Sequence, residues 1–244
     1  MKKHIPNILT LFNLLSGLIA LVFVFQQKWL YAALFVILGI LFDYADGFVA
    51  RKLNVSSPLG LQLDSLADMV TSGIVPAFSM FFLIQDALEV NIMQEFVWDS
   101  KHLLPFAGLL IALGSALRLA KFNVDDRQTT SFIGLPTPAN ALFIMALPLV
   151  IYYQKDLNWQ FLSNPYVLVL ISIASAYLLN AEIPLFSLKF KNYSWKDNPE
   201  KYILIAGAVL LIPFFKFLGI NLVIILYLIL SLFFKNRDIK KDEN

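Results

Sequence analysis

The sequence predicts an all-α protein, a polytopic transmembrane helical bundle of about eight spans. Of its 244 residues, 59% are hydrophobic and only 15% are charged, and the mean hydropathy is +0.71. A soluble domain usually carries about a quarter charged residues. The charges here also lie between long apolar runs, which is the pattern of a chain that crosses a membrane repeatedly.

A helix needs ~20 apolar residues to cross the hydrocarbon core, with some tolerance either way, and eight apolar runs of the chain meet this criterion. The first run is long for a signal-peptide core and lacks a clear small-residue cleavage site, so we expect it to be retained. The last two are short, but Pro213, Lys216 and Gly219 offer a turn between them. The predicted spans are 5–25, 29–50, 60–84, 103–121, 138–154, 164–181, 202–216 and 217–234.

The basic residues predict the orientation of these spans. If the N-terminus is cytoplasmic, all but four of the 19 Lys and Arg residues fall on the cytoplasmic side, the exceptions being Lys28, Lys101, Lys155 and Lys216. This bias follows the positive-inside rule. We therefore expect a protein of the inner cell membrane with both termini in the cytoplasm.

Two classes of function are excluded by composition. The chain has no cysteine, so disulfides, thiolate metal sites and cysteine nucleophiles are absent. The net charge of +2 is too small to indicate nucleic-acid binding.

Four aspartates lie at the cytoplasmic edge of the membrane. Asp43 and Asp46 end the second span, and Asp64 and Asp68 begin the third. Residues three or four apart share one face of a helix. The short loop at 51–59 folds the two helices into a hairpin, so we expect the four carboxylates to meet in one pocket.

Such a cluster requires a positive partner, because carboxylates repel each other and are costly where water is scarce. Oxygen ligands favour Mg²⁺, Mn²⁺ or Ca²⁺, and Mg²⁺ is commonly held by carboxylates while it binds substrate phosphates. The pattern therefore indicates a nucleotide or diphosphate substrate. The alternative is that the aspartates pair with basic residues to hold helices together, but only Arg51 is nearby.

Small residues accompany the aspartates. Gly47 follows Asp46, Ala50 lies one turn further, and Gly60 lies one turn before Asp64. A glycine inside a helix costs about 1 kcal/mol relative to alanine. Close approach of a ligand to the backbone is one reason to place glycine there.

Residues 42–68 resemble the CDP-alcohol phosphatidyltransferase family, whose signature is D-x2-D-G-x2-A-R-x8-G-x3-D-x3-D. The resemblance covers residues 5–181 and implies a six-helix catalytic core over 1–181. Residues 182–244 would add a cytoplasmic loop, two further transmembrane helices and a polar cytoplasmic tail. Every fixed position of the signature is present: Asp43, Asp46, Gly47, Ala50, Arg51, Gly60, Asp64 and Asp68.

The resemblance implies that the protein binds a CDP-linked lipid at the cytoplasmic face, transfers its phosphatidyl group to an alcohol and releases CMP. It implies Mg²⁺ or Mn²⁺ as cofactor, with Ca²⁺ as a substitute and room for a two-metal site. The implied metal ligands are Asp43, Asp46, Asp64 and Asp68, of which Asp68 would be the catalytic base. The implied CDP-binding residues are Asp43, Gly47, Ala50, Arg51, Gly60, Asn7 and Thr10, the last two from the stretch PNILT.

The acceptor alcohol is a separate question, because family members use serine, glycerol phosphate, inositol or phosphatidylglycerol. Residues 116–124 and 132–141 are similar to the corresponding stretch of the members that use L-serine, and two extra spans also suit them. Arg118 and Lys121 could face the serine carboxylate, or could anchor the helix at the interface. Glycerol 3-phosphate is a dianion and should demand more basic residues.

A cation-coupled transporter, with the aspartates as its ion site, is the alternative from another class. A transporter would place its site near the midplane, between two related halves. Here the carboxylates lie at one edge and no halves repeat. The expected partners are therefore CDP-diacylglycerol, L-serine and membrane lipid, without nucleic acid, and the resemblance is compatible with a homodimer.

Overall fold

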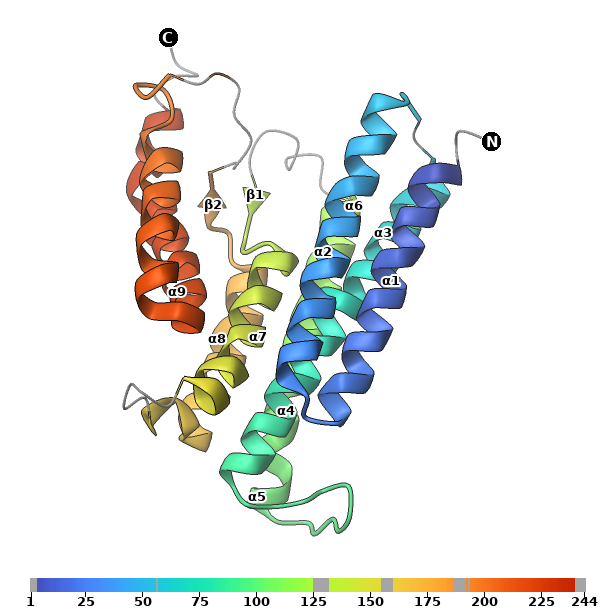
Figure 1. The fold of residues 1–244 in the computed structure, drawn as a ribbon, viewed down its shortest axis with the longest axis vertical. Coiled ribbons are helices and arrows are strands. Elements are labelled where there is room, and N and C mark those ends of the chain that lie inside the picture. The colour runs from blue at the N-terminus through green and yellow to red at the C-terminus, as the bar shows by residue number, and fades with distance from the viewer. Residues whose placement is uncertain are drawn as a thin grey trace.

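A computed structural model describes residues 4–55, 57–124, 132–154, 160–186, 192 and 194–239 of the chain. Lys155 and the last five residues of the predicted tail lie outside the described residues. The described part is a bundle of long helices (Figure 1), which confirms the predicted fold class. The helices are α1 (His4–Phe25), α2 (Trp29–Lys52), α3 (Pro58–Asp68), α4 (Val75–Ala87), α5 (Ser100–Leu103), α6 (Leu110–Val124), α7 (Thr137–Tyr153), α8 (Pro165–Asn180) and α9 (Pro199–Ile239).

Five helical stretches of the described residues are long and apolar enough to cross a membrane, by length and composition. They are His4–Phe25, Trp29–Lys52, Pro58–Ala87, Ser100–Val124 and Pro199–Phe234, with α7 and α8 as shorter apolar helices. These helices overlap all of the predicted spans. The number of membrane crossings remains a prediction.

Pro58–Ala87 is the central helix of the bundle, because 72% of the residues in its 18-residue apolar stretch are buried. It consists of α3, a π-helical stretch η1 (Met69–Ile74) and α4. Its start lies two residues before the predicted residue 60, because Ser57 caps it and Pro58 occupies its first turn. The Ser57 hydroxyl accepts a hydrogen bond from the Gly60 amide at 3.0 Å, which satisfies an otherwise unpaired donor of the first turn.

The long helix α9 folds back on itself, as the predicted turn requires. Lys216 has a non-helical backbone with φ 50° and ψ −123°. A Cβ built on Gly207 would lie 2.4 Å from a methyl carbon of Leu226, and one on Gly219 would lie 2.5 Å from the carbonyl oxygen of Leu211. A straight helix rises about 1.5 Å per residue and could not bring Gly207 to Leu226. The two halves of α9 are therefore antiparallel neighbours (Figure 1).

A short antiparallel pairing joins the core to this hairpin. Strand β1 (Phe132–Ile133) follows α6 and pairs with β2 (Pro184–Leu185), which follows α8. Two additional 3₁₀ stretches, η2 (Leu104–Leu109) and η4 (Gln160–Ser163), precede α6 and α8. In Figure 1 the start of α1, the turn from α2 to α3 and the ends of α9 lie at the same end of the bundle.

The main core lies between α4 and the helices around it. Val75, Met80 and Ile84 of α4 are fully buried and belong to one apolar cluster with Val36 of α2 and Ile144 of α7. By contrast, α1 and α2 expose large apolar side chains such as Leu41, Phe48 and Val22. An apolar exterior of this kind suits contact with lipid.

Candidate active site

Three of the predicted carboxylates meet where α2 ends and α3 begins. Asp43, Asp46 and Asp64 each offer an oxygen, and these oxygens all lie within 4.8 Å of one another. Asp46 is buried, and the other two are half-buried. The expected convergence of the hairpin is thus found for these three aspartates.

The turn between the helices creates this convergence. The Val55 amide bonds to the carbonyl of Ala50 at 3.0 Å, which closes the end of α2. Asn54 adopts φ 50°, a left-handed conformation that asparagine tolerates better than most residues. Ser57 and Pro58 then start α3, so the chain reverses within a few residues and sets Asp64 opposite Asp46.

The first helix supplies two polar contacts to the hairpin. The hydroxyl of Thr10 donates to Asp46 Oδ2 at 2.5 Å and also lies 3.1 Å from the carbonyl oxygen of Pro6. One turn further along α1, Asn13 Nδ2 donates to Asp68 Oδ1 at 3.1 Å. Thr10 was predicted at the site from the family resemblance, whereas Asn13 was missed. An amide inside an apolar span, on the face that carries Thr10, was the signal for it.

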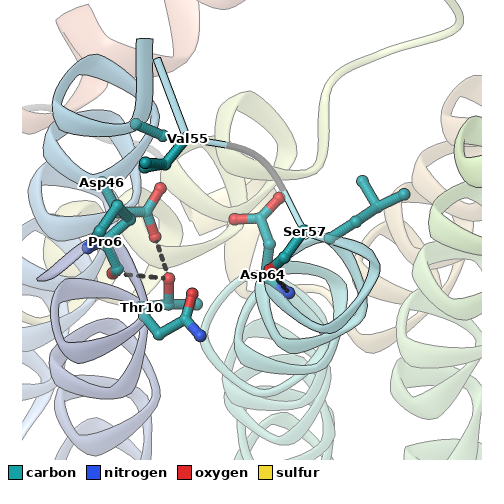
Figure 2. Close-up of a pocket in the computed structure, with 10 residues that line it drawn as sticks. Pro6, Thr10, Asp46, Val55, Ser57 and Asp64 are labelled. Atoms are coloured by element: carbon teal, nitrogen blue, oxygen red, sulfur yellow. Dashed lines mark hydrogen bonds between the residues drawn. The ribbon is translucent and has the colours of Figure 1, made fainter. Parts of the chain in front are cut away.

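A cavity of about 230 Å³ opens beside the carboxylates (Figure 2). Figure 2 shows Asp46 and Asp64 on two sides of it, from α2 and α3, with Thr10 below them on α1. Its walls include six of the residues predicted to bind CDP or metal by resemblance: Asn7, Thr10, Asp46, Ala50, Gly60 and Asp64.

Gly60 keeps this cavity open. A Cβ built on it would lie 3.2 Å from the Asn7 side-chain oxygen and 3.1 Å from the Ser57 hydroxyl, which is tighter than ordinary contact. Gly47 lies on α2 beside the exposed side chain of Arg51, whose Nη1 would be 3.4 Å from a Cβ at that position.

The remaining predicted residues of the signature stand outside the cavity wall. Asp43, Gly47, Arg51 and Asp68 do not line it, although Asp43 belongs to the carboxylate cluster. Within the described part of the chain, none of the four aspartates forms an ion pair with Lys or Arg. The structure therefore gives no support to the alternative in which the aspartates serve as helix-packing ion pairs.

Arg118 and Lys121 have different surroundings. Arg118 is 6% exposed, and its Nη1 donates to the carbonyl oxygens of Ile133 at 2.9 Å and Leu179 at 3.5 Å. Lys121 is exposed, one turn further along α6. The end of α6 does approach the hairpin, because Asn123 Nδ2 donates to the hydroxyl of Ser65, next to Asp64, at 2.9 Å.

Several known proteins are similar to this chain in sequence. The family model of the CDP-alcohol phosphatidyltransferases matches residues 3–180. The chain is 30% identical over 185 residues to a CDP-diacylglycerol–serine O-phosphatidyltransferase of Bacillus subtilis (strain 168), which covers 74% of this chain and 89% of that relative. It is 28% identical over 172 residues to an archaetidylserine synthase of Methanothermobacter thermautotrophicus, covering 69% of this chain and 65% of the relative. A CDP-diacylglycerol–serine O-phosphatidyltransferase of Saccharomyces cerevisiae is 33% identical over 161 residues, which is 59% of this chain and 53% of that relative.

Proposed function

This chain belongs to the CDP-alcohol phosphatidyltransferase family, and from that premise we propose that it transfers the phosphatidyl group of CDP-diacylglycerol to the hydroxyl of L-serine, giving phosphatidylserine and CMP. The observation that carries the proposal is the meeting of three carboxylates beside a cavity at one end of the helices. The names of the relatives in Bacillus and yeast support serine as the acceptor.

The carboxylate cluster fits a divalent cation. Three oxygens within 4.8 Å of one another, with no Lys or Arg paired to them among the described residues, form an oxygen-only donor set. Such a set suits Mg²⁺ or Mn²⁺, with Ca²⁺ as a substitute. Asp43, Asp46 and Asp64 would hold the ion, and Asp68 would complete a two-metal site if a second ion binds. When bound, the cation supplies positive charge to the phosphoryl oxygens and to the departing CMP.

The cavity is the proposed site of the cytidine diphosphate. Asn7 and Thr10 offer polar groups from α1, while Ala50 and Gly60 leave room on α2 and α3. Arg51, exposed at the end of α2, would reach a phosphate from outside the cavity.

Asp68 is the proposed base. In the reaction, the serine hydroxyl oxygen bonds to the phosphorus that carries the diacylglycerol, and the bond from that phosphorus to the CMP oxygen breaks. The hydroxyl proton passes to Asp68, and CMP leaves with the electron pair of the broken bond. Positioning of the hydroxyl beside the base would supply much of the rate gain.

Arg118 is the proposed partner of the serine carboxylate. It is buried, and within the described part of the chain its hydrogen bonds all come from Nη1. Nη2 and Nε are therefore left for a ligand. A buried guanidinium whose hydrogen bonds, among the described residues, go to neutral carbonyl oxygens gains from an anion. Lys121, being exposed, would act mainly as an anchor at the membrane surface.

The orientation is part of the same proposal. Both termini and the site would face the cytoplasm, where CDP-diacylglycerol and serine are both available, and the positive-inside bias supports this side. The enzyme would lie in the inner cell membrane, and a homodimer there is compatible with the family.

The test is CMP release by purified protein in detergent micelles. CDP-diacylglycerol and Mn²⁺ or Mg²⁺ are supplied with L-serine, glycerol 3-phosphate or inositol in separate reactions. We expect serine-dependent release that a chelator abolishes and that added Mn²⁺ restores. Release with another alcohol alone would overturn the serine acceptor but keep the family chemistry. No release with any acceptor, from protein shown to be folded, would refute the proposed function.

A further inference from the structure

Asn13 makes a buried contact with the proposed base. It lies inside α1 with 0% exposure, and its Nδ2 donates to Asp68 Oδ1 at 3.1 Å. Its own Oδ1 has no hydrogen-bond partner among the described residues. A Cβ built on Gly39 would lie 2.9 Å from that oxygen, so the amide is seated against the backbone of α2.

Thr71 holds Asn13 from the other side. It belongs to the π-helical stretch that begins directly after Asp68, it is fully buried, and its hydroxyl donates to the backbone oxygen of Asn13 at 3.1 Å. A Cβ on Gly17 would lie 2.3 Å from this hydroxyl, and one on Gly39 would lie 2.7 Å from the Thr71 methyl carbon. The threonine therefore fits between two helices only because both lack a side chain at that level.

The π-helical stretch connects Thr71, and with it the contact to Asn13, to Asp68. Stretches of π-helix are uncommon and are frequent at functional sites. Here the altered turn starts at Met69, directly after Asp68, and it contains Thr71, the residue that donates to the Asn13 carbonyl oxygen. Asp68 is thus constrained twice, through its own helix and through the amide of Asn13.

The direction of the hydrogen bond also matters. The Asn13 amide nitrogen can only donate, so it engages one lone pair of Asp68 Oδ1. Within the described residues, Oδ2 has no hydrogen bond, so it is the less engaged of the two oxygens. The hydrogen bond to Oδ1 fixes the orientation of the carboxylate and therefore the direction in which Oδ2 points.

We propose that Asn13 is a positioning residue, which aims Oδ2 of Asp68 at the acceptor hydroxyl and is itself seated by Thr71 between Gly17 and Gly39. This inference rests on the proposed function, in which Asp68 is the base. It assigns no contact with substrate to Asn13.

The experiment replaces Asn13 by leucine, which has a similar size but no donor. We expect Asn13→Leu to lower kcat by about 10- to 100-fold, as for a displaced catalytic group. KM for CDP-diacylglycerol and the metal concentration for half-maximal activity should stay near the wild-type values. Asn221→Leu is the matched control, because Asn221 is 3% exposed, its side-chain nitrogen donates a hydrogen bond to the Phe143 carbonyl, and its side-chain oxygen has no partner among the described residues.

A double-mutant cycle separates positioning from structural support. In an Asp68→Asn background the base is already lost, so Asn13→Leu should cause little further loss of the residual activity. Thr71→Val provides a second variant if Asn13→Leu does not fold; it should lower kcat in the same non-additive way. Size-exclusion profiles and thermal unfolding in detergent report folding for each protein.

The outcomes are distinct. Wild-type kcat in folded Asn13→Leu, or an equal loss of activity in the Asp68→Asn background, would overturn the inference and leave the proposed function standing. Wild-type protein that releases no CMP with any acceptor would refute the proposed function and this inference with it. A fall in kcat that disappears in the Asp68→Asn background would establish the positioning role.

Discussion

Thr10 and Asp46 are separated by 36 positions in the chain, yet the threonine hydroxyl donates to the aspartate carboxylate at 2.5 Å. The contact ties α1 to the end of α2, next to the other members of the carboxylate cluster. A ligand carboxylate that is held by a neighbour keeps its orientation when the metal is absent. The first helix therefore orients the proposed metal site, although it supplies no carboxylate to it.

Thr10→Val removes this hydrogen bond and keeps the shape of the side chain. We expect the Mn²⁺ concentration for half-maximal activity to rise about 10- to 100-fold, as for other residues that orient a metal ligand. Metal titration of CMP release measures the change. Ser16→Ala is the control, because among the described residues the Ser16 hydroxyl bonds within α1, to the carbonyl of Phe12 at 2.8 Å. An unchanged metal requirement in Thr10→Val would show that Asp46 needs no such support.

Asp43→Asn and Asp64→Asn each remove one charge from the cluster. We expect CMP release to fall by at least about 100-fold in each, because each variant would weaken binding of the proposed cation and of the positive charge it would bring to the phosphates. Isothermal titration with Mn²⁺ should show weaker binding as well. The matched control is Asp86→Asn at the far end of α4, where the carboxylate accepts bonds from Gln27 and Tyr152. Near-normal activity in both cluster variants would contradict the metal site.

Gly17→Ala tests the close contact between α1 and the π-helical stretch. The added carbon would lie 2.3 Å from the Thr71 hydroxyl and 3.0 Å from its Cα, so backbone must move. We expect a loss of roughly 1–3 kcal/mol of stability, the usual cost of overpacking. Thermal unfolding in detergent measures it.

The contrasting variant is Gly47→Ala, where the nearest atom is the end of a flexible arginine at 3.4 Å. Its unfolding temperature should equal or exceed that of the wild type, since alanine favours a helix by about 1 kcal/mol over glycine. Equal losses of stability in Gly17→Ala and Gly47→Ala would contradict the close packing of Thr71 against Gly17.

Arg118→Gln tests the proposed serine pocket. Removal of the buried cation should raise KM for L-serine by about 10-fold or more, the scale of a charged hydrogen bond of ~1.5–3 kcal/mol. KM for CDP-diacylglycerol should change little. Lys121→Gln is the control on the same helix, and its exposed position predicts a small effect. A larger effect at Lys121 than at Arg118 would reverse the assignment.

Gln154→Leu tests the two hydrogen bonds that hold the turn of the α9 hairpin. The Gln154 amide donates to the Phe215 carbonyl at 2.9 Å, and its oxygen accepts from the Leu218 amide at 3.3 Å. These backbone groups flank the non-helical Lys216 and would be left unpaired, which costs about 1–3 kcal/mol each when buried. We expect a lower unfolding temperature with unchanged KM for both substrates. Wild-type stability of Gln154→Leu would mean that water satisfies the Phe215 carbonyl and the Leu218 amide in place of the Gln154 side chain.

Part of the site was predictable because its signal is local. The spacing of Asp43, Asp46 and Asp64 around one short loop fixes which helix faces carry carboxylates, and a hairpin leaves few ways to arrange them. The turn at Lys216 was predictable for the same reason, from a proline and a glycine that flank it. The direct hydrogen bonds of Arg118 to the Ile133 and Leu179 carbonyls had no such local signal.

The sequence by itself determined the membrane class, the helical fold, the carboxylate hairpin and the family, because apolar run length, loop charge and motif spacing are properties of short segments. Only the tertiary structure decided that Asn13 meets Asp68 and that Thr71 is seated between Gly17 and Gly39. The physical reason lies in the composition of these helices, which are apolar on nearly every side. Lipid tails are as apolar as leucine, so hydrophobic periodicity does not tell which face packs against protein. That choice is made by close contacts between segments far apart in the chain.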